Sequence, residues 1–333
     1  MTPATYTANS QLKTINTSES WKGTPVDVKR NFMNHEYPFL PNFSDLWKWQ
    51  TTGNLQKEEK KNDKWKAPVI KDEAFLTSDK DMIVWLGHAT FYIRINSITL
   101  ITDPVFYSLP FVPRHSEMPV APEKLTDVDY ILLSHNHRDH CDKRSQKLLA
   151  KNNPKVKVLT GLKLDNLIYK WTKNKNIQGA GWYQEFNTGN DSIRIYYVPS
   201  RHWAKRGMFD ANTMLWGGFI IQCGGKTIYF MGDSGYGSHF KEIASLFPSP
   251  DYCIMGNGAY TPAWFMSANH IAPEDAVKAF NEMSGKHYIP MHYGTFDQSD
   301  EPMGEPLKRI KGLENEIKGK LLTPAIGEVI FIE

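Results

Sequence analysis

A short segment in the first half of the chain brings together three histidines and an aspartate, spaced as His-x-His-x-Asp-His. It follows directly on an apolar run, which predicts a strand that ends in a loop. Side chains alternate in an extended stretch, so His135 and His137 can bind one metal ion together. Asp139 and His140 come after the chain turns and can reach a second ion. Imidazole suits zinc, iron, copper and nickel, and the carboxylate makes the site harder.

Three later segments each offer one more potential ligand directly after a strand-like run and beside glycine or proline. These ligands are His202, Asp233 and His292. Each ion in the first segment still needs ligands from elsewhere, and we expect these side chains to supply them. One such case alone would carry little weight, but the full set is typical of a metallohydrolase.

Two further polar residues are placed to orient the ligands. Asp103 stands after a predicted strand, and we expect it to accept a hydrogen bond from a ligand imidazole; a turn-forming Asp-Pro pair is the alternative. His88 is placed similarly beside a glycine. A serine nucleophile is not indicated, because Ser134 and Ser234 lack a Gly-x-Ser-x-Gly elbow.

Several motifs surround these candidates and extend the pattern over about residues 30–300. They are NFMN at 31–34, NFSDLW at 42–47, WLGHAT at 85–90, TDP at 102–104, SHNH at 134–137, HW at 202–203, LWG at 215–217, GDSGY at 232–236, GAY at 258–260, WFM at 264–266 and HYGTF at 292–296. The His/Asp motifs resemble the metallo-β-lactamase superfamily. The wider set resembles its N-acylphosphatidylethanolamine-hydrolysing phospholipase D family, and the WFM block is the most specific part.

The resemblance implies an α/β fold, the αββα sandwich, with two mixed sheets, outer helices and a di-metal site at one edge. It implies two zinc ions per chain, although iron and manganese stay open from the residues alone. One zinc would be held by His135, His137 and His202, and the other by Asp139, His140 and His292. Asp233 would bridge both through its two oxygens. A metal-bridging hydroxide would then attack phosphorus, releasing N-acylethanolamine and phosphatidate.

Roles near the substrate also follow from the resemblance. His270 would contact phosphate or protonate the leaving alkoxide, with a helix-entry role as the alternative. Tyr260, Trp264, Phe265 and Met266 would line a passage for acyl chains, although core packing would look the same. The candidate catalytic residues are Asp139, Asp233 and His270.

Other functions stay open. The same fold serves lactones, cyclic nucleotides and nucleic acids, and a non-catalytic metal-binding protein is a third class. A net charge of only +3 argues against a nucleic-acid partner, for which a strongly basic face is expected. The aromatic-rich flanks favour a phospholipid substrate at a membrane surface. The sequence leaves open whether the chain forms a homodimer.

The chain is organised around one large domain. With 333 residues, 41% of them hydrophobic, and ligands in both halves, we expect a catalytic domain over residues 81–333 after an extension over residues 1–80. Residues 1–30 are polar and predict a loose arm. An aromatic segment follows, packed on the core or facing a membrane; it contains Phe32, Tyr37, Phe39, Leu40, Phe43, Leu46, Trp47 and Trp49. Neither a transmembrane stretch nor a clear signal peptide is visible, so we expect a cytoplasmic protein that could bind a membrane peripherally.

Local patterns predict the elements that position the site. Strands are expected at 83–86, 90–95 and 98–102, and Asp142 should cap a helix through about Ala150. Gly224-Gly225 predicts a hairpin between two later strands, and Pro273 should begin a helix.

Overall fold

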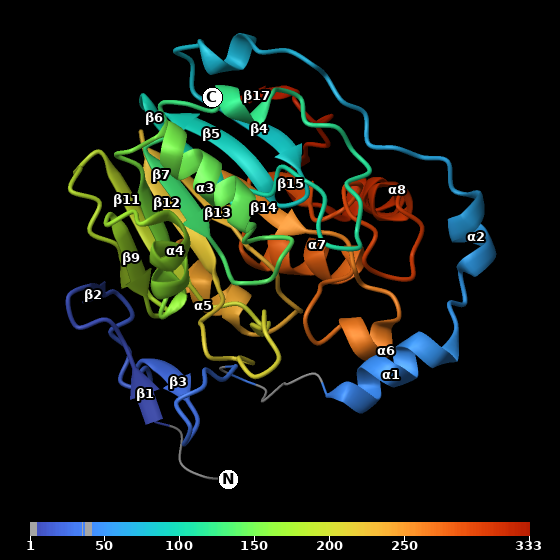
Figure 1. The fold of residues 1–333 in the computed structure, drawn as a ribbon, viewed down its shortest axis with the longest axis horizontal. Coiled ribbons are helices and arrows are strands. Elements are labelled where there is room, and N and C mark those ends of the chain that lie inside the picture. The colour runs from blue at the N-terminus through green and yellow to red at the C-terminus, as the bar shows by residue number, and fades with distance from the viewer. Residues whose placement is uncertain (1–4, 35, 37–41) are drawn as a thin grey trace.

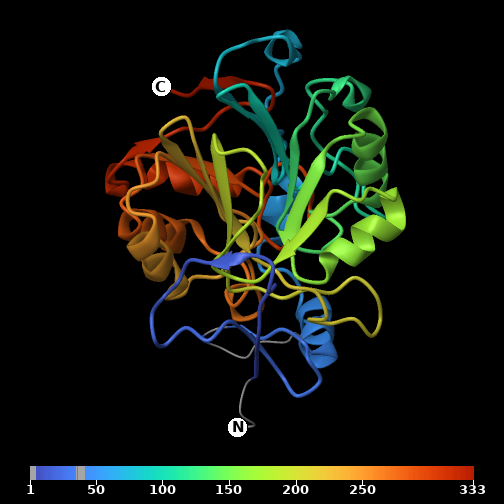
Figure 2. The ribbon, with the colours of Figure 1, turned by 90° about the vertical axis from the view of Figure 1, so that its left-hand side faces the viewer.

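The computed structural model describes residues 5–34, Glu36 and residues 42–333. Two sheets face each other in the middle of the molecule, and helices cover the outer side of each (Figure 2). The predicted α/β sandwich with two mixed sheets and outer helices is therefore confirmed. Within the described residues, none of the helices combines the length and the apolar character needed to cross a membrane.

The first sheet has seven strands in the order β17-β4-β5-β6-β7-β8-β9. In this order, neighbouring strands from β17 through β6 are antiparallel, and neighbouring strands from β6 through β9 are parallel. The expected strands at 90–95 and 98–102 are found at those bounds, and the first extends by one residue at each end. The strands are β4 (Met82–Gly87), β5 (Thr90–Ile95), β6 (Ile98–Thr102), β7 (Tyr130–Leu133), β8 (Lys157–Gly161), β9 (Ile177–Ala180) and β17 (Val329–Phe331).

The second sheet has eight strands in the order β16-β15-β14-β13-β12-β11-β10-β2. It repeats the scheme of the first sheet, since antiparallel strands lie on one side and parallel strands on the other. The hairpin predicted at Gly224-Gly225 joins β12 to β13. The strands are β2 (Lys13–Thr14), β10 (Gln184–Glu185), β11 (Ile193–Val198), β12 (Gly218–Cys223), β13 (Lys226–Phe230), β14 (Tyr252–Gly256), β15 (His287–Met291) and β16 (Lys320–Leu321).

Helices cover the outer faces of both sheets (Figures 1 and 2), with α3 and α4 on one side and α5, α7 and α8 on the other. Asp142 caps α3 by accepting a hydrogen bond from the Ser145 amide, as predicted, and Pro273 begins α7. The helices are α1 (Phe43–Thr52), α2 (Lys57–Asn62), α3 (Lys143–Asn152), α4 (Leu164–Thr172), α5 (His239–Leu246), α6 (Ala263–Met266), α7 (Pro273–Glu282) and α8 (Glu305–Gly312), with 3₁₀ turns η1 (Ala74–Leu76), η2 (Pro122–Lys124) and η3 (Glu314–Glu316).

Strand β4 shows how the layers are built. Its side chains alternate between two faces, because a strand has a period of two residues. Ile83 and Trp85 join the large core that includes both sheets, while Val84 and Leu86 join the cluster packed with α3 and α4. Both faces are buried, which explains why the strand reads as a continuous apolar run.

The N-terminal region departs from the expected loose arm. β1 (Thr5–Thr7) pairs with β3 (Thr24–Val26), and β2 extends the second sheet beyond β10. The Trp21 ring packs edge-on against Tyr183, with 4.7 Å between ring centroids. The prediction was wrong for the described residues of this range, because backbone pairing gives order that a polar composition does not reveal. The division of the chain near residue 80 stays a prediction.

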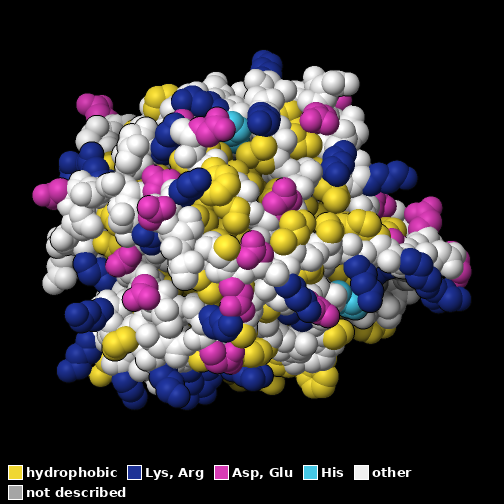
Figure 3. All heavy atoms as spheres, turned by 90° about the horizontal axis from the view of Figure 1, so that it is seen from above, with side chains coloured by type: hydrophobic (Ala, Val, Ile, Leu, Met, Phe, Trp, Pro, Cys, Tyr) yellow, Lys and Arg dark blue, Asp and Glu magenta, His cyan; other side chains and the backbone are white. Residues whose placement is uncertain are grey.

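The aromatic segment is only partly described, since Tyr37, Phe39 and Leu40 lie outside the described residues. Phe32 is buried, whereas Trp47 on α1 is 62% exposed. Core packing therefore accounts for part of this segment, and α1 presents an apolar side chain to solvent. On the face seen from above, positive and negative side chains are interspersed (Figure 3), in keeping with the small net charge.

Candidate metal centre

The candidate ligands meet because their strands end at the same edge of the sandwich. β4, β6 and β7 run in one direction in the first sheet, and β11, β13 and β15 do so in the second. The loops after these six strands carry the potential ligands and their hydrogen-bond partners. These residues are His88, Asp103, His135, His137, Asp139, His140, His202, Asp233 and His292.

One cluster contains His135, His137, His202 and Asp233, whose ligand atoms all lie within 4.8 Å of one another. Nδ1 of His137 lies 2.9 Å from Nε2 of His135 and 3.1 Å from Nε2 of His202. One ring nitrogen cannot hydrogen-bond well to two other ring nitrogens at once. A bound cation explains such a convergence of nitrogen atoms better than hydrogen bonding does.

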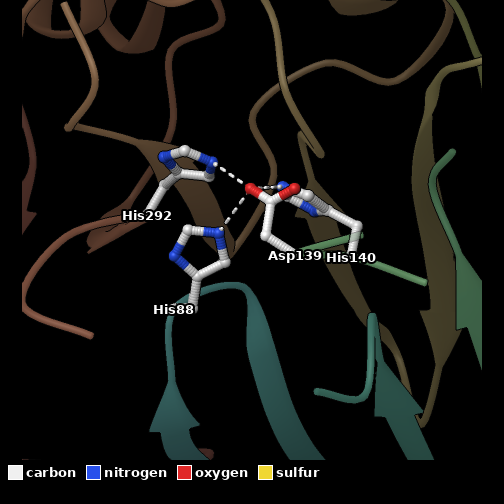
Figure 4. A group of neighbouring side chains, drawn as sticks. All are labelled: His88, Asp139, His140 and His292. Atoms are coloured by element: carbon white, nitrogen blue, oxygen red, sulfur yellow. Dashed lines mark hydrogen bonds and ion pairs between the residues drawn. The ribbon is translucent and has the colours of Figure 1, made fainter. Parts of the chain in front are cut away.

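The second cluster contains His88, Asp139, His140 and His292, again within 4.8 Å (Figure 4). Oδ2 of Asp139 is its common point. This oxygen lies 3.1 Å from Nε2 of His88, 3.5 Å from Nε2 of His140 and 3.6 Å from Nε2 of His292. His88, expected only to orient a ligand, is therefore as close to the carboxylate as the candidate ligands are.

Asp233 connects the two clusters. Its Oδ2 lies 3.1 Å from Nε2 of His140 and 3.2 Å from Nε2 of His292. The same oxygen is 3.7 Å from Nε2 of His202 and 3.9 Å from Nε2 of His135. Asp233 thus occupies the place of a bridging carboxylate, with one oxygen facing both clusters, and this is a binuclear His/Asp site.

The residues fit a pair of divalent cations. Nε2 of His140 and Nε2 of His292 are buried and face Oδ2 of Asp233, but neither makes a hydrogen bond of good geometry within the described residues. Burying polar atoms without well-formed hydrogen bonds is costly, and several nitrogens and carboxylate oxygens that converge on one point are typical of ligands for a cation. The donors are imidazoles and carboxylates, which suit zinc and other first-row transition metals.

Neighbouring groups hold the ligand rings in place. Oδ2 of Asp103 lies 2.8 Å from Nδ1 of His140, which is the contact expected from the sequence. The Asn269 carbonyl lies 3.0 Å from Nδ1 of His202, and the Ser134 hydroxyl lies 2.9 Å from Nδ1 of His135. Contacts of this kind set the tautomer and orientation of a ligand imidazole.

Without bound metal, the histidines of the site differ in their pKa values and therefore in their charge at pH 7. Burial lowers the pKa of His137 to about 4, so its ring is neutral at pH 7. Burial also opposes a charge on His292, but the carboxylates of Asp233 and Asp139 outweigh it and raise its pKa to about 9. The pKa of His140 is raised well above its ordinary value by the same two carboxylates, again against burial.

A pocket of about 370 Å³ opens onto the clusters. His270 and Met266 line it, and their contact with a substrate stays a prediction. Tyr260 does not; it is buried, and its hydroxyl donates to Glu305. Trp264 is 48% exposed. The lining residues are His137, Arg138, Asp139, Trp203, Lys205, Arg206, Gly207, Asp233, Ala259, Met266, His270, His292 and Gln298.

Two residues that contact the candidate metal ligands were not predicted from the sequence. Gln298 lines the pocket and donates from Nε2 to Asp139, 3.0 Å away. The Asn34 side chain holds the His202 backbone from both sides, donating to its carbonyl at 2.8 Å and accepting from its amide at 3.1 Å. Neither residue belongs to a ligand motif. Asn34 ends the NFMN motif of the resemblance, but that motif does not indicate a contact with His202.

Backbone geometry is a second feature hidden from the sequence. His88, Asp103 and His292 have φ angles of 53°, 32° and 67°. Such values are uncommon for residues other than glycine and concentrate at functional sites. They turn these side chains toward the clusters directly after their strands end.

Comparison with known proteins agrees with this geometry. A family model described as "Beta-lactamase superfamily domain" matches residues 99–293. A Caenorhabditis elegans protein named N-acyl-phosphatidylethanolamine-hydrolyzing phospholipase D 1 is 33% identical over 252 residues, covering 69% of this chain and 68% of that protein. A mitochondrial protein of the same name from Saccharomyces cerevisiae is 28% identical over 326 residues, covering 92% and 68% respectively.

Solved structures agree on the fold. Igni18, a metallo hydrolase from Ignicoccus hospitalis, superposes with a TM-score of 0.58 at 17% identity, covering 76% of this chain and 99% of that one. The resemblance of the motifs to the superfamily is confirmed by the family match. The chain therefore belongs to the metallo-β-lactamase superfamily, as a metal-dependent hydrolase with a binuclear His/Asp site.

Proposed function

We propose that this protein is a zinc-dependent phosphodiesterase of phospholipase D type. It hydrolyses N-acylphosphatidylethanolamine-like lipids to N-acylethanolamine and phosphatidate. The observation that carries the proposal is the pairing of two ligand clusters, joined at Asp233, with a pocket that has both basic and apolar walls. The similarity to the worm and yeast phospholipases supports the choice of substrate.

We expect the ligands to divide between the two ions as the resemblance implies. His135, His137 and His202 would hold one ion, and Asp233 would be shared with the other. Asp139, His140 and His292 would hold the second ion. Two bound divalent cations would supply a hydroxide near neutral pH and offset the negative charge of the phosphodiester.

The basic wall suits the phosphate group of such a lipid. The Arg206 guanidinium donates to the Asn136 carbonyl at 3.0 Å and to the Cys141 carbonyl at 2.7 Å. These contacts fix it beside the His-x-His-x-Asp-His loop. Lys205 is exposed next to it, so positive charge meets a phosphate at the mouth of the pocket.

The apolar wall suits the hydrocarbon part of the substrate. The Trp203 ring is half-buried and packs edge-on against His137, with 4.8 Å between the ring centroids. Met266 adds an unbranched side chain that adapts to varied apolar shapes.

His270 is better suited to binding phosphate than to supplying a proton. Its Nδ1 lies 3.8 Å from Oδ2 of Asp233, on the pocket side of the site. Burial lowers its pKa to about 4, so the ring is neutral at pH 7. A neutral imidazole can donate one N–H to a phosphate oxygen, but it is a poor source of a proton for a leaving alkoxide.

The test is a mass-spectrometric assay of metal-quantified protein on N-acylphosphatidylethanolamine in mixed micelles, with and without chelator. We expect the protein to release N-acylethanolamine and phosphatidate, and we expect the chelator to abolish this release. Phosphatidylethanolamine without the N-acyl group is the matched control substrate. If protein carrying two metals per chain releases neither product, the proposed substrate is wrong. Lactones and other phosphodiesters would then be the next substrates to assay.

A further inference from the structure

A side chain outside every ligand motif reaches the second cluster. Gln298 lies in the loop after β15, and its Nε2 donates to Oδ2 of Asp139 at 3.0 Å. An ionised carboxylate can only accept hydrogen bonds, so the amide must present its NH₂ group to Asp139. We propose that Gln298 is a positioning residue that holds Asp139 for the second metal ion, and that the N-terminal α1–α2 segment fixes the loop that carries it.

Asp139 needs such support because of where it stands. It lies in a loop after β7, and its side chain is 11% exposed to the pocket. Its Oδ2 must face His140 and His292 if all three are to share an ion (Figure 4). A neutral donor to a carboxylate makes a charge-assisted hydrogen bond, which is stronger than one between neutral groups. Gln298 and His88 thus both restrain the same carboxylate oxygen, Oδ2 of Asp139.

The loop with Gln298 is itself held from a distant part of the chain. The Lys60 ammonium, on α2, contacts both the Asp297 carboxylate and the Ser299 carbonyl. These two residues flank Gln298 in sequence, so one cation secures the backbone on both sides of it. Lys60 is half-buried, which makes its contacts less exposed to competing water than those of a surface lysine.

Two more contacts from the same segment reach the next residue of the loop. The Trp49 indole donates to the Asp300 carboxylate at 3.1 Å, and the Asn54 amide donates to the Asp300 carbonyl at 2.7 Å. Trp49 also stacks on Phe265, with 5.2 Å between centroids. Figure 1 shows α1 beside α6 and α2 beside α8, so this segment follows one side of the molecule.

The arrangement links residues far outside the His/Asp motifs to the metal centre. The chain of contacts runs from Lys60 through Asp297 and Ser299 to Gln298 and then to Asp139. Losing a hydrogen bond to a metal ligand typically costs about 10- to 100-fold in metal affinity. The effect should fall on the second ion, because none of these residues belongs to the first cluster. The inference rests on the proposed metal centre and not on the proposed substrate.

The experiment is a Zn²⁺ titration of the metal-free full chain against a competing chromophoric chelator, with Gln298→Leu and the matched control Ser299→Ala. The Ser299→Ala change keeps the backbone carbonyl that Lys60 binds. We expect Gln298→Leu to weaken one of the two sites about 10- to 100-fold and to leave the other unchanged. Ser299→Ala should bind both ions as the wild type does.

A spectroscopic measurement separates positioning from damage to the fold. In Co²⁺-substituted protein, Gln298→Leu should change the visible bands of one of the two ions only. Lys60→Met should weaken the same site in the same direction but less. Wild-type affinities at both sites, or equal losses at both, would overturn the role of Gln298. If the Lys60→Met variant keeps the wild-type metal affinity at the second site, the role of the N-terminal segment is overturned. If the leucine variant does not fold, Gln298→Met takes its place in the same measurements.

Discussion

Asp103 and His140 form a buried pair in which Oδ2 of the carboxylate lies 2.8 Å from Nδ1 of the ring, and neither side chain is exposed. Burial raises the pKa of Asp103, although its contacts with His140 and Ser134 work in the opposite direction. The pair leaves Nε2 of His140 aimed at both Asp233 and Asp139. The orientation of one ligand is thus set by a residue that follows a different strand.

Replacing Asp103 by asparagine should weaken metal binding. The amide can still accept a hydrogen bond through its oxygen, but it lacks the charge that makes the His140 ring a stronger ligand. We expect Asp103→Asn to lower the affinity for one ion by about 10- to 100-fold. Calorimetric titration with Zn²⁺ measures this, with Asp191→Asn on the surface as the control. Unchanged affinity would show that Asp103 serves only the local turn.

Removing a ligand should abolish activity and spare the fold. His137→Ala deletes a ring that meets two others, and Asp233→Asn removes the shared negative charge. We expect either change to reduce turnover by orders of magnitude. Circular dichroism should stay like that of the wild type, because both residues lie in loops after β7 and β13 and not within the strands of the two sheets. Wild-type rates in either variant would refute the assignment of the site.

Metal binding should release protons. In the metal-free protein the pKa of His292 is about 9 and the pKa of His140 is raised well above its ordinary value. Both rings are therefore in the doubly protonated, positively charged form at pH 7. A metal ion binds only the neutral ring, so it must displace these protons. Zn²⁺ affinity should therefore increase with pH up to about 9. Calorimetry at one pH in buffers of different ionisation enthalpy counts the protons. Heats that do not depend on the buffer would contradict the prediction.

If the substrate is a membrane lipid, we expect a lipid surface to increase the rate of hydrolysis. Trp47 on α1 is 62% exposed, and tryptophan favours the boundary between water and lipid. We expect higher rates in micelles than on a short soluble diester, and Trp47→Ala should reduce only the micellar rate. Tyr169→Ala, at an exposed position on the outer helix α4, is the matched control. Equal rates with and without micelles would count against a membrane-surface enzyme.

The sequence by itself determined the ligand types and the elements that carry them. Histidine and aspartate at the ends of apolar runs are local patterns, and so are the cap at Asp142 and the Gly224-Gly225 hairpin. The family followed from the same short motifs. Such features depend on neighbours in sequence, which is why they could be predicted without coordinates.

Only the tertiary structure decided which distant side chains meet. His88 reaches Asp139 through a left-handed backbone at the end of β4. Gln298 reaches the same carboxylate from a loop that lies 159 residues away along the chain. Polar N-terminal residues joined a sheet through backbone hydrogen bonds, which side-chain composition does not encode. These contacts depend on how the strands are ordered and paired, and that is a property of the whole folded chain.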